Sequence, residues 1–167
     1  MAIKRILTFD LGMKTGYAFG LISEKTQSVL DARQDSGTKC FETNKRFQGG
    51  GYRYLMFNNW LNDMFAMYTP NEVWFEAVHA HKGTAAAHIY GALSGMLMVL
   101  CEKRSIPYNG VPVATIKKQI SGKGNTNKDG MLLAMEKFLP KKFSGDDNEV
   151  DAIAILQMAC VTYTKQI

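Results

Sequence analysis

The chain has 167 residues, 46% of them hydrophobic and 21% charged, which fits one globular domain with a sizeable core and excludes wholesale disorder. Its 20 Lys and Arg residues outnumber 15 Asp and Glu residues, and the resulting net charge of +5 suits a polyanionic partner. The three cysteines lie in no C-x-x-C pattern, so neither a disulfide framework nor a zinc site is expected.

No continuous apolar signal segment follows the basic start of the chain. The longest apolar run, Gly91 to Cys101, is shorter than a bilayer-spanning helix needs. We therefore expect a cytoplasmic protein that does not enter a membrane.

The predicted elements begin with a hairpin. Its first strand runs from Ile3 to Asp10, a glycine-punctuated turn follows, and its second strand runs from Tyr17 to Ile22. A third strand is expected over Ser28 to Arg33, although apolar and polar residues alternate poorly there.

The middle of the chain alternates helices and strands. Apolar residues at helical spacing predict an amphipathic helix over Tyr52 to Met67, and a short strand is expected over Glu72 to Glu76. The next helix is expected over Ala85 to Lys103, with Thr84 as its N-cap. Ile106 to Val113 is predicted to form another strand, which its prolines assign to an edge of the sheet.

The last third of the chain is predicted to be mostly helical. A short helix is expected over Ala114 to Ile120, a glycine- and lysine-rich loop over Ser121 to Lys128, and two further helices over Lys128 to Phe138 and Asn148 to Thr164. Strands followed by alternating helices and strands predict a single α/β domain over residues 1–167.

Carboxylates recur where predicted elements end or begin. Asp10 and Glu76 each end a strand, and an acid at such a position in an apolar segment needs compensation. Asp147 and Asp151 are four residues apart on the last helix and share one face, while Asn148 can also reach that face. The acids at the start of this helix are also explained as caps, but Asp151 lies inside the helix, where capping explains it poorly.

Converging carboxylates repel one another unless cations lie between them, and hard oxygen ligands select Mg²⁺ or Mn²⁺. We therefore expect two Mg²⁺ ions per site, with Mn²⁺ able to substitute. Such a pair would clamp the attacking and leaving oxygens of a phosphodiester.

Four segments of the chain together resemble the motifs of RuvC-type Holliday-junction resolvases. They are Ile6 to Tyr17, Phe75-Glu76, Ile116 to Lys128 and Asp147 to Ala152. They occur in the same order as in the family, cover most of the chain, and look closest to phage-encoded members.

The resemblance implies an RNase H-like fold, with a five-stranded mixed sheet flanked by helices. It implies a homodimer that resolves four-way DNA junctions by paired symmetric cuts, leaving 5′-phosphate and 3′-hydroxyl ends. Metal-binding and catalytic roles carry over to Asp10, Glu76 and Asp151, and we add Asp147. The candidate DNA-contacting residues are Lys14, His79, His81, Lys117, Lys118, Lys123 and Lys128.

The sequence departs from the family at two positions. Many members carry an acidic or His ligand three residues before the last Asp, where this chain has Asn148, so Asn148 remains the rival of Asp147 as fourth ligand. Many members also carry an aromatic residue three positions after the second-motif Glu, and here that residue is His79. Junction distortion and cut-site preference depend on this position.

Two other site types fit the sequence poorly. His79, His81 and His88 lack metal-site spacing, which argues against zinc. The loop Gly122-Lys123-Gly124 lacks the P-loop order, so no nucleotide cofactor is expected. The remaining alternatives are a broader nuclease of flaps and forks, another RNase H-like nuclease, and a junction-binding architectural protein.

Overall fold

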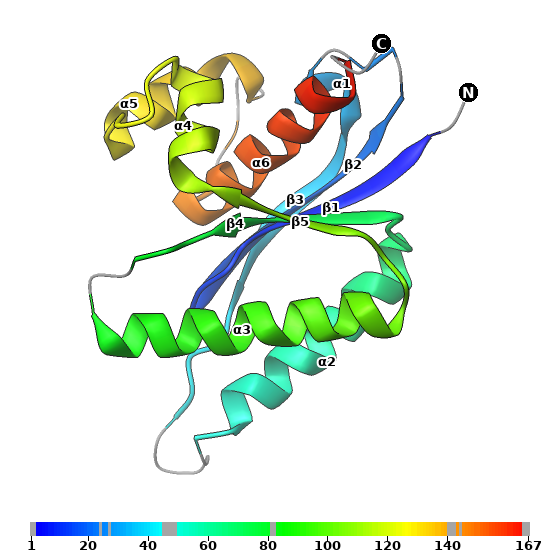
Figure 1. The fold of residues 1–167 in the computed structure, drawn as a ribbon, viewed down its shortest axis with the longest axis vertical. Helices are drawn as coiled ribbons and strands as arrows, with labels where there is room; N and C mark the ends of the chain where they lie inside the picture. The colour runs from blue at the N-terminus through cyan, green and yellow to red at the C-terminus, as the bar shows by residue number, and fades with distance from the viewer. Residues whose placement is uncertain are drawn as a thin grey trace.

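The computed structural model describes residues 3–23, 25–26, 28–44, 50–80, 83–139, 143 and 145–164. A central sheet with the strand order β3-β2-β1-β4-β5 separates two helical layers (Figure 1). The first three strands pair antiparallel, and β1, β4 and β5 run parallel, so the sheet is mixed. The strands are β1 Lys4–Asp10, β2 Lys14–Ile22, β3 Arg33–Cys40, β4 Glu72–Ala77 and β5 Tyr108–Pro112.

The helices divide between the two faces of the sheet (Figure 1). The long helices α2 (Tyr52–Tyr68) and α3 (Thr84–Lys103) cover one face. The other face carries α6 (Asp147–Thr164) with the shorter helices packed around it. These are α1 Val29–Ala32, α4 Val113–Ser121, α5 Lys128–Met135 and the 3₁₀ turn η1 Glu136–Phe138.

Strict alternation along β1 and β4 builds the two cores. Successive side chains of a strand point to opposite faces. Leu7 and Phe9 pack with α2 and α3, while Ile6 packs with α6. On β4, Phe75 faces the α2–α3 layer and Trp74 faces α6. Residues of β1 and β4 that lie an even number of positions from Ile6 or Trp74 therefore also point toward α6.

A network of hydrogen bonds surrounds a buried carboxylate at the N-terminal end of β4. Glu72 accepts hydrogen bonds from Lys4 Nζ at 3.0 Å, from Trp74 Nε1 at 2.8 Å and from Asn109 Nδ2 at 2.8 Å, and a further one from the Tyr163 hydroxyl. These donors come from β1, β4, β5 and α6, so one side chain joins three strands to the last helix. Four donors are enough to stabilise the charge of a buried carboxylate.

Three local predictions are corrected by the structure. The expected strand over Ser28 to Arg33 is instead the short helix α1, and β3 begins only at Arg33. Gly83 is the N-cap of α3, and Thr84 is already inside that helix. The apolar run around Gly91 belongs to this 20-residue helix, which is long and apolar enough to cross a membrane by length and composition alone. Because its inner residues pack into the α2–α3 core, we interpret α3 as a layer of the domain.

The other predicted elements are confirmed, with shifts at their ends. The edge position predicted for the strand after α3 is correct, because β5 is the last strand in the sheet order. The predicted helix over residues 128–138 is split into α5 and η1.

Candidate active site

Asp10 and Glu76 lie side by side because of the parallel pairing of β1 and β4. Phe9 is the register partner of Phe75, so the next residue along each strand is an acid. Each acid comes two residues after a residue that faces α6, namely Thr8 and Trp74, and therefore lies on the same face of the sheet. Two carboxylates from different strands therefore point into the space beneath α6.

The start of α6 is held close to these strand ends. The Thr8 hydroxyl, buried in β1, donates a 2.8 Å hydrogen bond to the carbonyl oxygen of Ala152. On β2, Gly16 makes room for the helix, since a Cβ there would lie 1.8 Å from the carbonyl oxygen of Asn148. This close approach brings Asp151 near Asp10 and Glu76, and its charge raises the pKa of both acids.

The electrostatics of these three acids indicate that they share one site. Burial, together with Glu76, Asp151 and Asp146, raises the pKa of Asp10 to about 8. Burial and Asp151 raise the pKa of Glu76 to about 7, against the opposing effect of Lys117. Burial and the negative charge of Asp147 raise the pKa of Asp151 to about 6. A cation bound between such buried, mutually repelling acids would stabilise their charged forms.

Asp147 occupies the rim of the same site. It lines a cavity of about 320 Å³ together with Glu76, Asp151, Lys117 and Lys128. It also forms an ion pair with Lys128, and its side chain is half exposed. Its rival Asn148 lines the same cavity, so the structure brings both candidates for the fourth ligand to the site.

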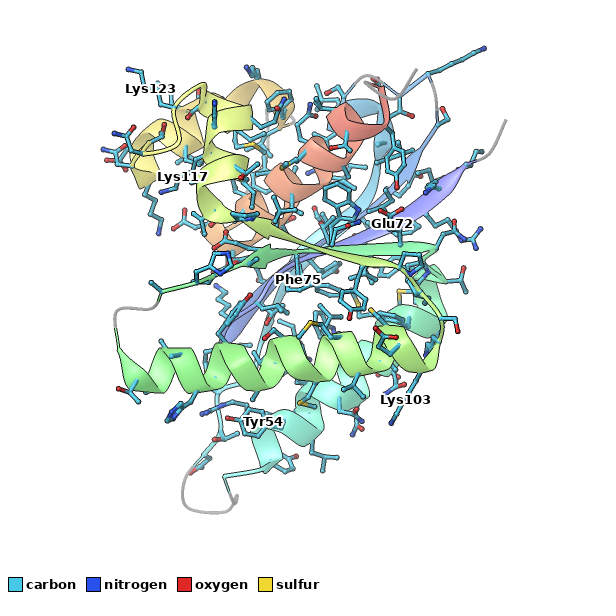
Figure 2. The ribbon with its side chains drawn as sticks, in the orientation of Figure 1. Tyr54, Glu72, Phe75, Lys103, Lys117 and Lys123 are labelled. Atoms are coloured by element: carbon cyan, nitrogen blue, oxygen red, sulfur yellow. The ribbon has the colours of Figure 1, made fainter. Side chains whose placement is uncertain are left out.

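The predicted DNA-contacting residues fall into two groups. Lys117 and Lys128 lie in the cavity wall, and Lys14 forms an ion pair with Asp146. Lys118, Lys123 and His79 are exposed. Lys118 belongs to α4, and Figure 2 shows Lys123 on the same α4–α5 side of the molecule. His81 lies outside the described residues.

Asp146 is a residue near the site that its sequence context does not indicate as a site residue. Its position predicts a helix cap, and its Oδ1 does accept the backbone N–H of Glu149 at 3.1 Å. It also raises the pKa of Asp10, which shows how near it lies to the buried acids. No sequence signal pairs it with Lys14, because 132 positions separate the two residues.

The donor set fits a hard divalent cation. Among the described residues, no three His, Cys, Asp or Glu side chains are already arranged as ligands around one point. Glu76 and Asp151 are nevertheless close enough to Asp10 to raise its pKa, Asp151 also raises the pKa of Glu76, and oxygen donors of this kind suit Mg²⁺ or Mn²⁺. Asp147 or Asn148 would complete such a site from the rim.

The strand order, the two helical layers and the acids under α6 define an RNase H-like fold with an acidic site. Solved structures of such proteins superpose on the chain. RuvC of T. thermophilus in complex with a Holliday junction substrate gives a TM-score of 0.74 at 16% identity and covers 96% of this chain and 97% of its own. The yeast mitochondrial Holliday junction resolvase Ydc2 gives a TM-score of 0.65 at 15% identity, over 98% of this chain and 80% of its own.

Sequence relatives within this class carry one name. The crossover junction endodeoxyribonuclease RuvC of Wolbachia sp. subsp. Brugia malayi is 24% identical over 162 residues, 96% of this chain and 95% of the relative. The RuvC of Brachyspira hyodysenteriae is 25% identical over 142 residues, 85% of this chain and 84% of the relative. No protein-family model matches the chain. The predicted resemblance to the RuvC family is thus confirmed over nearly the whole chain.

Proposed function

We propose that this protein is a metal-dependent, structure-selective DNA endonuclease that resolves four-way junctions by paired symmetric cuts. The observation that carries the proposal is the convergence of Asp10, Glu76 and Asp151 from three separate elements, with pKa values raised by burial and by one another. The similarity to RuvC proteins supports the junction as substrate. A protein that only binds junctions would gain nothing from buried acids facing a polyanion.

The four acids, with Asp147 as the fourth, are proposed to hold two Mg²⁺ ions. When bound, such ions activate water and stabilise the charge that develops on the oxygens of a cleaved phosphodiester. Asn148 is the alternative fourth ligand. Lys117 acts from the cavity wall, where its charge already offsets those of Glu76 and Asp151. Lys128 is placed to take a phosphate once Asp147 turns to a metal ion.

We assign the DNA backbone to the exposed face that carries α4 and α5. Lys118 and Lys123 are exposed on this face, where Figure 2 shows Lys123, and they would bind phosphates. His79, two residues beyond the end of β4, would stack on an unpaired base. We also propose that His81 contacts DNA. The cytoplasm is the proposed location, since the substrate is cellular DNA.

The proposed partner protein is a second copy of the chain. A junction with two-fold symmetry suits a two-fold dimer with two sites. The outer face of α3 offers an apolar groove of about 540 Å³ between α2 and α3, bordered by Tyr54 and Lys103 (Figure 2). Gly91 and Gly95 lie one turn apart in this groove, and a Cβ added at either would meet nothing within 4 Å.

The groove is lined by residues of both α2 and α3. Glycines inside an exposed helix reduce its stability, so two of them on one apolar face are best explained by the close approach of another helix. We propose that α3 of the second copy packs here, on the layer opposite the acidic site.

The test is cleavage of end-labelled four-way junction, three-way fork, linear duplex and RNA–DNA hybrid, each with Mg²⁺ and with EDTA. Paired, symmetric, Mg²⁺-dependent cuts in the junction alone are the expected result. Cuts in every branched form would favour a general debranching nuclease, and cleavage of the hybrid alone would overturn the proposed substrate. Tight junction binding without any cleavage would favour the architectural alternative.

A further inference from the structure

Four acids lie within residues 146–151, and they divide into two pairs with different partners. Asp147 and Asp151 line the cavity of the proposed active site. Asp146 and Glu149 instead bind side chains of the sheet. The segment 146–151, which begins just before α6, therefore presents one pair of carboxylates to the site and uses the other pair to attach the start of α6 to β2 and β3.

On β2 the attachment consists of two residues on one face of the strand. Lys14 and Gly16 are two positions apart, so they point the same way. The Lys14 ammonium forms an ion pair with Asp146. Gly16 accepts the backbone of the same helical turn, because its missing Cβ leaves room for the Asn148 carbonyl.

On β3 the same pattern is repeated. Ser36 and Thr38 are also two positions apart on one face. The Ser36 hydroxyl donates a 2.6 Å hydrogen bond to Glu149 Oε1, and the Thr38 hydroxyl bonds to Asp146. Alternate residues of two neighbouring strands thus form a seat for the first turn of α6.

We propose that Asp146 and Glu149 are positioning residues that set the direction of α6, so that Asp147 and Asp151 meet Asp10 and Glu76 in metal-binding geometry. This inference rests on the proposed metal-dependent function. Lys14 then serves the active site by holding Asp146 and does not depend on a DNA phosphate for its role.

Substituting Lys14 separates positioning from simple electrostatics. Removing a positive charge near an acidic site should by itself tighten Mg²⁺ binding, since it raises the local negative potential. If Lys14 positions the helix, Lys14→Met should instead weaken Mg²⁺ binding by about 10-fold, which is typical for the loss of residues that orient metal ligands. The measurement is calorimetric titration of Mg²⁺ into the whole protein without DNA, together with thermal unfolding.

Rescue and control variants complete the test. Lys14→Arg should restore the wild-type Mg²⁺ constant, because Arg keeps the ion pair. Asp146→Asn keeps a good N-cap but loses the ion pair, so it should weaken Mg²⁺ binding with little change in melting temperature. Asp63→Asn removes one charge from an exposed position on α2 and should leave the constant unchanged. If Lys14→Met does not fold, Ser36→Ala breaks the seat from β3 and should also weaken Mg²⁺ binding.

The outcomes distinguish this inference from the proposed function. Tighter or unchanged Mg²⁺ binding in Lys14→Met would overturn the positioning role. Weaker junction binding by that variant in EDTA, with an unchanged Mg²⁺ constant, would return Lys14 to a phosphate contact. A wild-type protein that binds no Mg²⁺ at all would overturn the metal-dependent function itself.

Discussion

At the scale of single residues, Asp10, Glu76 and Asp151 are the acids that we propose to carry the chemistry. Asp10→Asn and Asp151→Asn should each reduce junction cleavage by at least about 10³-fold, since each removes an ionisable ligand from a site with few donors. Junction binding in EDTA should be retained or become tighter, because each variant removes a negative charge that faces DNA. Cleavage rates and mobility-shift titrations measure the two effects, and Asp63→Asn is the control. A variant that still cleaves at the wild-type rate would refute the assignment of its acid.

The fourth ligand is also decided at this scale. Asp147 and Asn148 both line the cavity and can both reach the helical face of Asp151, but only Asp147 carries a charge, and that charge raises the pKa of Asp151. We therefore expect Asp147→Ala to weaken Mg²⁺ binding at least about 10-fold more than Asn148→Ala. Calorimetric titration of both variants makes the comparison, and the reverse order would make Asn148 the ligand.

Gly16 is the residue whose structural role is most sharply defined. Alanine at this position would place its Cβ 1.8 Å from the backbone oxygen of Asn148, and a backbone atom cannot move aside as a side chain can. Gly16→Ala should therefore reduce the free energy of unfolding by about 2–3 kcal/mol. Gly12→Ala is the control, because its Cβ would meet its nearest neighbour at an ordinary 3.5 Å. Urea unfolding of both proteins tests the difference, and equal stability would contradict the close approach of α6 to β2.

At the scale of elements, a residue's position within a strand or helix is what the sequence predicts well. The sequence predicted that Asp10 and Glu76 each end a strand and that Asp147 and Asp151 share a helical face because they are four apart. The meeting of Asp10 and Glu76 follows from the parallel pairing of β1 and β4, which local patterns do not predict. Local patterns also failed at α1, where Ser28 caps the turn and the backbone N–H of Val29 donates to Gln157 Oε1 at 2.7 Å. A hydrogen bond between residues 128 positions apart cannot be predicted from local sequence patterns.

The Glu72 network links elements in a pH-dependent way. Burial alone would raise the pKa of Glu72, but hydrogen bonds from Tyr163, Lys4 and Trp74 outweigh it, and the pKa lies below its ordinary value. A carboxylate with a lowered pKa stabilises the folded state above the unfolded pKa of about 4.3, and that stabilisation is lost as the pH falls through the folded pKa. Four strand and helix contacts therefore weaken together in acid.

Substitution of Glu72 should reveal this dependence. Glu72→Gln should reduce the free energy of unfolding at pH 7 by about 1–3 kcal/mol, and the difference from wild type should shrink below about pH 4. Chemical unfolding at a series of pH values measures it. Glu42→Gln, at an exposed position, should show neither effect. A difference that stays constant from pH 7 to pH 3 would show that the charge of Glu72 does not contribute.

At the scale of the whole molecule, the two helical layers are proposed to have separate tasks, with DNA on one side of the sheet and the second copy on the other. The dimer should have a mass of about 37 kDa, twice the 18.6 kDa of one chain. Gly91→Leu should raise the helix stability of the monomer by up to about 1 kcal/mol while weakening dimerisation, because the new side chain fills the groove. The fraction of dimer in sedimentation analysis should fall, while the thermal stability of the monomer should rise. If dimerisation is unaffected, the interface lies elsewhere.

The salt dependence of junction binding tests the other layer. Lysines that neutralise phosphates release counterions, and each such contact contributes about 0.9 to the slope of log affinity against log salt. Lys118→Ala and Lys123→Ala should therefore each lower that slope by about one without changing the Mg²⁺ constant. Lys25→Ala, equally exposed but beyond the end of β2, should leave the slope unchanged. Because the net charge of +5 would attract DNA to any part of the surface, an equal reduction in all three variants would mean that binding follows overall charge and that the α4–α5 face has no special role.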